Sequence, residues 1–537
     1  MKHRDNNNVV AGFSPRSLSH TVFLAKAERG AKARDYIAAG PGTRLDSWQT
    51  SGVTTLNRRD LLKLAAAVPM TSGFKLQETA NTKPHGSELM SKLSTYMTEA
   101  GTRKLPEEIV EKTRQVVLDA VTAMISGAEL PPGQFAIRFA RAYKGEKIAT
   151  VAASNVVCGP IEAALANGML AHSDETDDTH SFSQSHPGCS VVPSALAVGE
   201  QFGIDGNRFL RAVALGYDIG PRVTITLGRL PYAAETHRST HALSGTFGSA
   251  AAAGCAANLN AQQMRWLLSY TAQQASGLAS WQRDTDHIEK AFDFGGMAAR
   301  NGVTAALLVQ AGGTGVEDVF SGADNFFQAF LPKNDAGLMI EKLGERYEVT
   351  RTSFKKWTVG SPIQAVLDAL EIILKKNTVD PERVMQIQVR VATNEAAVVN
   401  NRELSDICMQ HLVAVMLIDK TLTFRSAHDQ LRMKDPAVLR LRAKVQLIPD
   451  EELERRMPQR EGTVDILMED GKRITEHVAA VRGTFNNPMS REEVIAKARD
   501  LMSPVLGANP TTKLIDTILA LENVKNIREL RPLLQRG

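Results

Sequence analysis

The sequence predicts a mainly α-helical fold, in which a large multi-helical domain carries an inserted α+β domain and is completed by helices at the C-terminus. Three observations support this prediction: Ala-rich helical patterns fill residues 85–345, alternating apolar and polar segments fill 346–484, and helical patterns return in 485–537. The chain has 537 residues, of which 43% are hydrophobic, so it can bury the cores of two or three domains. Residues 1–84 precede these patterns and are set aside as a leader.

The leader resembles an export signal. Residues 55–73 read TLNRRDLLKLAAAVPMTSG, in which the paired Arg58 and Arg59 precede a short Ala-rich stretch. This arrangement is typical of a twin-arginine signal, here following a polar arm. The sequence therefore predicts a periplasmic protein. The alternative is the start of an ordinary amphipathic helix in a cytoplasmic protein.

Helical signals open the large domain. Residues 105–129 read LPEEIVEKTRQVVLDAVTAMISGAE, with Pro106 and two glutamates in the first turn and a stop at Gly127. Ala- and Gly-rich helical patterns follow, and small residues on helix faces allow the helix axes to approach closely. This part of the chain therefore predicts a tightly packed multi-helix bundle.

Strand signals dominate the inserted domain. Four segments alternate apolar and polar residues and are rich in Val, Ile and Thr: YEVTRTSF, VMQIQVRVAT, AKVQLIP and GTVDILMEDGKRITEHVAAV. The last contains EDGK, a hairpin turn. Helical patterns interleave, so we expect an α+β domain with an antiparallel sheet. The C-terminal patterns SREEVIAKARDLM and TTKLIDTILALENV are expected to return to the first domain.

Composition narrows the class of protein. The net charge is only +4 and aromatic residues make up 5%, which argues against a nucleic-acid partner. The four cysteines lie far apart, without the spacing of a zinc or iron–sulfur site, so no cofactor is expected. No apolar run reaches the roughly 18 residues that a membrane span requires.

A dense acidic loop is the strongest chemical signal. Residues 173–188 read SDETDDTHSFSQSHPG, between two predicted helices, and carboxylates there stand beside His180 and His186. Three interpretations are open: a solvated turn, a divalent metal site, or an acid/base site in which carboxylates and histidines tune one another's proton affinity. The spacing fits no closed set of metal ligands, so no metal is predicted.

The loop and several other segments resemble the MmgE/PrpD family, which contains 2-methylcitrate dehydratases and cis-aconitate decarboxylase. The resemblance lies in HSDETDDTHSFSQSHPG, HRSTHALSGTFGSAAAA, DTDHIEKAFDFGG, KKWTVGSPIQAVLDAL and VRGTFNNPMSREEV, and it covers about residues 88–535 in order. It implies a helical domain, an α+β lid domain, a site between them, and a homodimer.

The resemblance also implies site residues. Within the loop these are Glu175, Asp177, Asp178, Thr179 and His186. Of these, His186 is assigned as an acid or base, Glu175 and Asp178 are assigned to orient and charge-tune histidines, and Thr179 is assigned to donate a hydrogen bond to substrate.

Further implied residues lie outside the loop. A family histidine falls on Ser239 here, so the second histidine is either His237 or His241. Lysines that would hold substrate carboxylates fall at Lys290 and Lys355. Lys356, beside Lys355, and His411 or Gln410, at the place of a family tyrosine, are assigned to contact the substrate.

The chemistry implied is a lyase reaction on a small polycarboxylate. Removing water or CO2 from such a molecule passes through a carbanion beside a carboxylate, and cations must absorb the developing charge. A hydro-lyase of the 2-methylcitrate dehydratase kind is the leading prediction. Decarboxylation or epimerisation of a related acid, a non-catalytic carboxylate-binding protein and a divalent-metal hydrolase are the alternatives.

Overall fold

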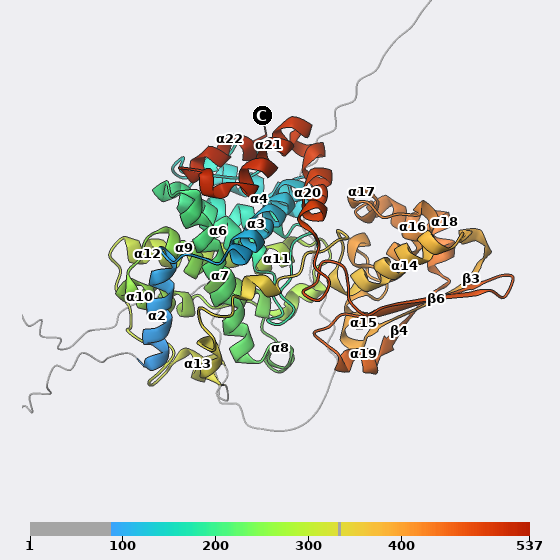
Figure 1. Ribbon diagram of the computed structural model, residues 1–537, viewed down its shortest axis with the longest axis horizontal. Coiled ribbons are helices and arrows are strands. Elements are labelled where there is room, and N and C mark those ends of the chain that lie inside the picture. Colours follow the sequence, from blue (N-terminus) through green and yellow to red (C-terminus); the bar gives the residue numbers. More distant parts are fainter. Residues whose placement is uncertain (1–86, 331–334, 537) are drawn as a thin grey trace, which may run out of the picture. The chain divides into compact units, whose positions relative to one another are not determined.

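The computed structural model describes residues 87–330 and 335–536 (Figure 1). The predicted leader, with Arg58 and Arg59, lies outside the described residues. The mainly helical fold is confirmed by the many helices and the two small sheets of the described chain.

One hydrophobic core joins the helices that precede residue 331 to those that follow residue 490 (Figure 1). The helices of this body are α2 (Glu88–Ala100), α3 (Glu107–Gly127), α4 (Pro131–Ala142), α5 (Pro160–Ala171), α6 (Gly188–Phe202), α7 (Gly206–Leu227), α8 (Leu230–Thr236), α9 (Thr240–Ala256), α10 (Ala261–Gln273), α11 (Ile288–Ala291), α12 (Met297–Gln310), α13 (Phe326–Phe330), α20 (Arg491–Leu506), α21 (Ala508–Leu519) and α22 (Arg531–Leu534). A two-stranded antiparallel sheet, β1 (Ala149–Thr150) and β2 (Val157–Cys158), precedes α5.

Close approach of two helices fixes the centre of the body. Helix α5 meets η2, a π-helical turn at Phe292–Gly296, where Gly168 faces Gly295. A Cβ atom on Gly295 would lie 2.0 Å from the carbonyl oxygen of Gly168, so only glycine fits this contact. Turns of this kind are frequent at functional sites, and this one carries Phe294.

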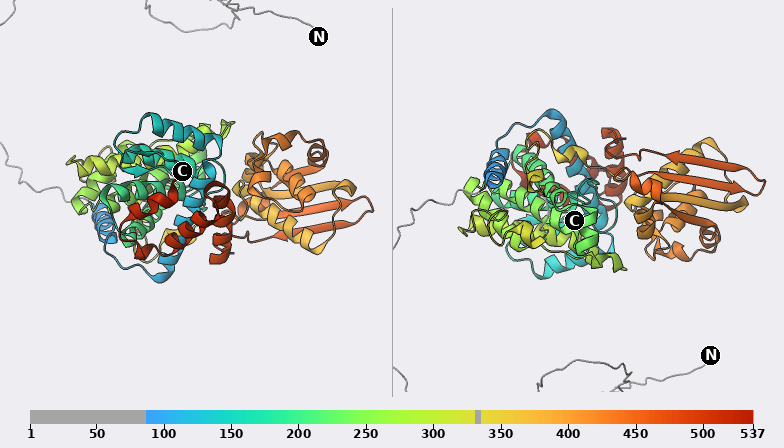
Figure 2. Two further views of the ribbon diagram at one scale, coloured as in Figure 1. Left: turned by 90° about the horizontal axis from the view of Figure 1, so that it is seen from above. Right: turned by 90° about the horizontal axis from the view of Figure 1, so that it is seen from below.

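A separate core builds the α+β region, residues 357–481. Its sheet contains β3 (Val384–Ala392), β4 (Val445–Asp450), β5 (Gly462–Met468) and β6 (Arg473–Val478), in the order β4-β3-β5-β6. The helices are α14 (Gln364–Lys376), α15 (Thr393–Val399), α16 (Met409–Asp419), α17 (Phe424–Ala427), α18 (Pro436–Arg442) and α19 (Glu451–Arg455). Helices α14 and α16 cover one face of this sheet (Figure 2).

Two sequence predictions about this region were wrong. The sheet is mixed rather than antiparallel, because β4 runs parallel to β3, and the connection between these two strands contains α15 to α18. The segment YEVTRTSF is no strand but contains a 3-10 turn, η4 (Glu348–Arg351). The carboxylate of Glu348 accepts hydrogen bonds from Arg346 and Arg351, and these bonds hold the segment in a turn. The predicted EDGK hairpin joins β5 and β6.

The C-terminal helices contact the first helices of the body. Helix α20 lies beside α3 (Figure 1), and the ammonium of Lys497 donates to Asp119 at 2.7 Å and to the carbonyl of Thr176 at 2.9 Å. The last part of the chain therefore supports the loop that carries the predicted site.

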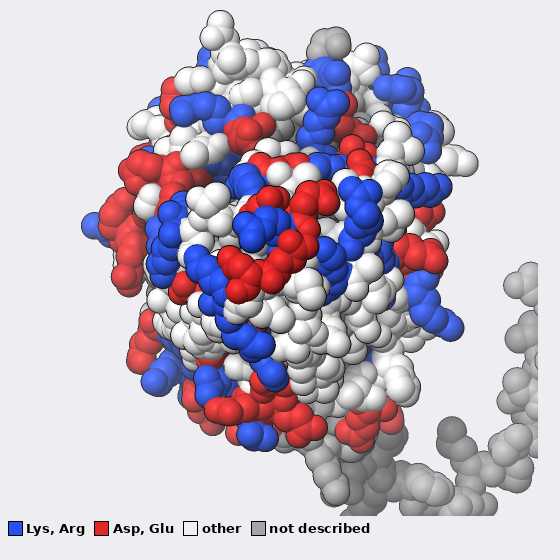
Figure 3. Space-filling view, turned by 90° about the vertical axis from the view of Figure 1, so that its right-hand side faces the viewer, with Lys and Arg blue, Asp and Glu red and all other residues white. Residues whose placement is uncertain are grey.

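Charges of both signs lie side by side on the face shown in Figure 3. The α+β region contains ion pairs such as Lys376–Glu476, at 2.9 Å. Within residues 87–330 and 335–536, no helix has the length and apolar character required to cross a membrane.

Candidate active site

The acidic loop between α5 and α6 is buried. Each of Asp174, Glu175, Asp177 and Asp178 exposes 5% or less of its surface, and His186 exposes 9%. This burial excludes a solvated turn. Buried carboxylates persist only where cations or hydrogen-bond donors compensate their charge.

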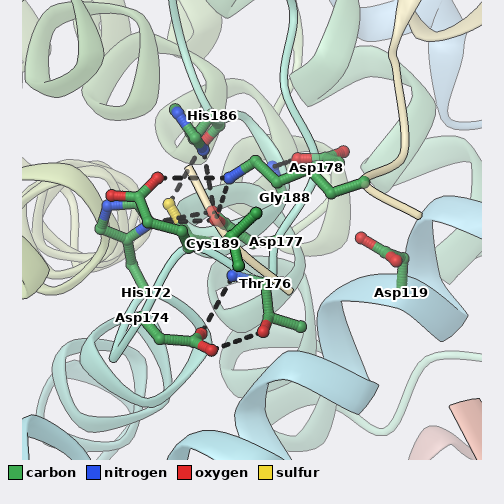
Figure 4. Close-up of polar contacts among 12 residues, drawn as sticks. Asp119, His172, Asp174, Thr176, Asp177, Asp178, His186, Gly188 and Cys189 are labelled. Carbon is green, nitrogen blue, oxygen red and sulfur yellow. Dashed lines mark hydrogen bonds and ion pairs between the residues drawn. The ribbon is translucent and has the colours of Figure 1, made fainter. Parts of the chain in front are cut away.

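Two imidazoles converge on Asp177 (Figure 4). Nδ1 of His172 and Nδ1 of His186 donate to its carboxylate oxygens at 3.0 and 3.2 Å. Burial by itself would raise the pKa of Asp177, but attraction to His172, His186 and Lys355 holds this pKa well below its usual range. Because Nδ1 of His186 carries the donated proton, its Nε2 is left free to accept another.

Two ammonium groups converge on Glu175. Nζ of Lys290 contacts one carboxylate oxygen, and Nζ of Lys355 lies 3.4 Å from the other and 3.6 Å from Asp177. Although burial disfavours a buried cation, Glu175 and Asp177 raise the pKa of Lys355 above its usual value. The two lysine side chains thus meet at the loop, Lys290 from α11 and Lys355 from the segment just before the α+β region.

His241 joins this cluster through Phe294. The Phe294 ring stacks on His241 at 3.8 Å between centroids and on His172 at 4.4 Å, with interplanar angles of 10° and 18°. His186 lies 5.2 Å from His241 by the same measure. Burial lowers the pKa of His186 to about 4 and that of His241 well below its usual value, so both rings are neutral bases at pH 7.

Asp178 links the loop to helices α6 and α7. Its carboxylate accepts from the backbone N–H of Gly188 at 3.0 Å and from the hydroxyl of Tyr217 at 2.6 Å, on α6 and α7. Burial and the neighbouring Asp119 raise its pKa to about 7. Asp178 thus anchors the start of α6, while Asp177 faces the histidines.

The side chains of five predicted residues do not contribute to this cluster. His237 is exposed at the end of α8, and Lys356 pairs with Glu371 at 2.7 Å. Gln410 hydrogen-bonds Asn400 at 2.7 Å, and His411 is buried without a hydrogen-bond partner among the described residues. Thr179 pairs with Ser353 through backbone bonds.

The assignment of Lys356, Gln410 and His411 to substrate contact is therefore not supported by their positions. Lys356 turns toward α14 because two carboxylates, Asp368 and Glu371, lie there. Gln410 and His411 lie in the first turn of α16, which packs into the core of the α+β region.

Sequence reasoning missed four residues of the cluster: His172, His287, Phe294 and His428. His172 ends α5 and His287 precedes α11 in a left-handed conformation, with φ 64°. Burial lowers the pKa of His287 to about 3. The signal for His172 was present, because it directly precedes the acidic loop, whereas nothing local marks His428.

Among the described residues, two sets of side chains have the donor atoms of a metal site, with atoms within 4.8 Å of one another in each set: His172, Glu175 and His287, and His172, Asp177 and His186. In the first set both oxygens of Glu175 already face ammonium groups. In the second, the Asp177 carboxylate already accepts from both histidines. A cation would have to displace these partners, so the donors fit a charge-balanced acid/base site better than a metal centre.

Neutral imidazoles beside two lysine side chains make this cluster a candidate acid/base site for anionic ligands. The cluster lies in a helical body that carries an α+β region. The chain belongs to the MmgE/PrpD family: the MmgE/PrpD N-terminal domain matches residues 91–339 and the MmgE/PrpD C-terminal domain matches residues 357–523.

Two curated relatives match nearly end to end. The cis-aconitate decarboxylase-like protein oryM of Aspergillus oryzae is 24% identical over 84% of this chain and 98% of its own length. The cis-aconitate decarboxylase of Aspergillus terreus is 23% identical over 83% of this chain and 96% of its own length. The second relative is named as a decarboxylase, which is a lyase, and the first is named for its likeness to that enzyme.

Proposed function

We propose that the protein is a lyase that acts on a small polycarboxylate through a carbanion next to a carboxylate, as a metal-independent hydro-lyase of the 2-methylcitrate dehydratase kind. The observation that carries this proposal is the meeting of Lys290 and Lys355 at Glu175, beside the neutral rings of His186 and His241.

Each group has a role in a balanced reaction. Nε2 of one histidine takes the proton next to a substrate carboxylate, and the electron pair left on carbon turns that carboxylate into a dianionic form. Lys290 and Lys355 stabilise this charge. The electron pair then forms the new double bond as hydroxide leaves, and the proton that the first histidine took from carbon is returned to this hydroxide, which makes it water and leaves both rings neutral.

The names of the relatives favour a second candidate, decarboxylation of cis-aconitate or a related acid. In that reaction the C–C bond breaks, CO2 leaves, and a protonated histidine delivers a proton to the carbanion. Epimerisation needs the same carbanion, with a proton removed from one face and returned to the other.

One NMR experiment separates these reactions. The purified protein is incubated in D2O with a panel of citrate-like acids, including 2-methylcitrate and cis-aconitate. A new alkene without deuterium indicates dehydration, loss of one carbon with deuterium uptake indicates decarboxylation, and deuterium uptake with inversion indicates epimerisation. Thermal stabilisation by an acid that never turns over indicates a binding protein and would contradict the proposal.

Treatment with a chelator distinguishes the proposed lyase from a divalent-metal hydrolase. We expect full activity after dialysis against EDTA, because the proposed reaction uses imidazoles and ammonium groups only. Loss of activity that is restored by a divalent cation would instead support the metal hydrolase.

A further inference from the structure

His428 reaches the acidic loop from the α+β region. It ends α17, and its ring lies on that of Phe424, 4.2 Å between centroids. Nδ1 lies 2.7 Å from the carbonyl oxygen of Phe424, and Nε2 lies 2.8 Å from Oδ2 of Asp174. Nδ1 is thus placed to donate a hydrogen bond, whereas Nε2 lies at ion-pair distance from Asp174 without the alignment of an N–H hydrogen bond.

This geometry assigns a proton to each nitrogen. A neutral ring that donates from Nδ1 to the Phe424 carbonyl would leave the lone pair of Nε2 2.8 Å from the Asp174 carboxylate, and the two would repel each other. The imidazolium form keeps the Phe424 hydrogen bond and gives Asp174 a buried counter-charge, without which its buried carboxylate would be costly.

Asp174 transmits this contact to the catalytic loop. Its carboxylate accepts from the backbone N–H of Thr176 at 3.0 Å and from the Thr176 hydroxyl at 2.5 Å. These bonds close a turn around Glu175, the residue that both site lysines contact. We propose that His428, as an imidazolium ion, is a positioning residue that fixes Asp174 and thereby the orientation of Glu175 toward Lys290 and Lys355.

The charged surroundings favour this assignment. Besides Asp174, the carboxylate of Asp406 lies 3.9 Å from Nε2 of His428, and the charges of Glu175 and Lys290 act on the pKa of Asp406. Burial alone would lower the pKa of His428, but Asp174, Asp406 and the Phe424 carbonyl raise it to about 9. The contribution of protonated His428 to the stability of the folded chain is therefore complete below the unfolded-state pKa of histidine, about 6.5. This contribution is lost as the pH rises through about 9.

The protonation state can be measured without any substrate. In 15N NMR spectra of the full chain labelled at histidine, the signals absent from H428Q identify the His428 ring. We expect both of its nitrogens to show imidazolium shifts at pH 7.5, with a titration midpoint near pH 9. A ring that is neutral at pH 7.5 would overturn the proposal, and this outcome needs only the folded wild-type protein and an assignment.

Amide exchange tests the positioning role. We expect H428Q to raise hydrogen exchange in residues 173–180, and H428K, which keeps a positive charge, to restore part of the protection. The matched control is H477Q. His477 lies on β6, and its ring also contacts a carboxylate, that of Glu461, at 3.1 Å, but this pair is not part of the acidic loop. Equal exchange in this loop for wild type, H428Q and H477Q would overturn the positioning role.

The catalytic consequence rests on the proposed function. With the acid that the wild type converts, we expect kcat/KM of H428Q to fall by about 10²-fold, the loss typical of a misplaced catalytic group. We also expect the wild-type profile to fall above pH 9 and the fall to move to higher pH in H428K. If no acid is converted, the proposed function fails while the NMR and exchange results still decide the assignment of His428.

Discussion

Four positions along the chain separate His237 from His241, yet only His241 reaches the cluster. Helix α8 ends with His237 in a left-handed conformation, φ 57°, and exposed. Ser239 then caps α9, and the hydroxyl of Ser239 donates to Asp293 at 2.5 Å. The first turn of α9 therefore presents His241 to Phe294.

Replacement of single histidines tests this distinction. We expect H186Q and H241Q each to lower kcat by about 10²–10⁴-fold, the range for a lost acid or base, with little change in thermal stability. H237Q is the matched control and should retain wild-type turnover, because its side chain is exposed. Equal losses in H237Q and H241Q would contradict the assignment of the second histidine.

The pH profile follows from the low pKa of His186. A base acts only when unprotonated, and kcat/KM reports ionisation in the free enzyme. Because burial lowers the pKa of His186 to about 4, we expect kcat/KM to have no acid limb near pH 6.5 and to fall only as the pH drops through about 4. Initial rates from pH 3.5 to 8, with circular dichroism to confirm folding, measure this. A limb near pH 6.5 would contradict it.

At the scale of elements, the contact of α5 with η2 sets the geometry of the site. Gly168 and Gly295 bring the two backbones together, and the π-helical turn directs Phe294 between two imidazoles. The site thus depends on a backbone contact that contains no catalytic side chain.

Alanine at this contact should be disruptive. We expect G295A to reduce the free energy of unfolding by about 3 kcal/mol or more, because the new Cβ would overlap the Gly168 carbonyl. The control is G101A: Gly101 has φ −59°, and a Cβ there would lie 3.2 Å from the end of the Arg208 side chain and in ordinary contact, 3.6 Å, with the Thr98 carbonyl oxygen. Urea unfolding of both variants measures the difference, and similar midpoints would contradict the expectation.

Local patterns predicted much of this architecture. Acidic residues, Pro106 and Gly127 predicted α3, which spans Glu107–Gly127, and alternation predicted β3, β5 and β6. Local sequence could not show that β4 pairs in parallel with β3, because pairing depends on the whole connection between them. It also could not show the η4 turn, which depends on ion pairs of Glu348.

The candidate site was predictable only in part. The resemblance to the family pointed to Glu175, His186, Lys290 and Lys355, which lie together in the structure, although their roles remain predictions. His428 was not predictable, because its contact with Asp174 spans about 250 positions of the chain and no motif surrounds it.

At the scale of the whole molecule, two proposals concern compartment and assembly. We propose twin-arginine export of the chain, which would place the protein in the periplasm. By resemblance to its family, the chain is proposed to form a homodimer, and sedimentation velocity at several concentrations tests that state.

Substitution of the arginine pair tests export. In a bacterial host with a twin-arginine pathway, we expect the wild type in the periplasmic fraction, with an N-terminus downstream of Arg59, and the double variant R58K/R59K in the cytoplasm at full length. Cell fractionation followed by N-terminal sequencing measures both. Wild-type protein that stays cytoplasmic with an intact N-terminus would contradict the proposal.

The contact of Lys497 with Asp119 and Thr176 has a consequence for biosynthesis. A ribosome completes α3 and the acidic loop more than 300 residues before it translates α20. Until then the Asp119 carboxylate has no ammonium partner from α20, and the Thr176 carbonyl lacks its donor. Nascent chains that lack α20 therefore cannot complete the contacts of the acidic loop, and products of premature termination before α20 are expected to be degraded by cellular proteases.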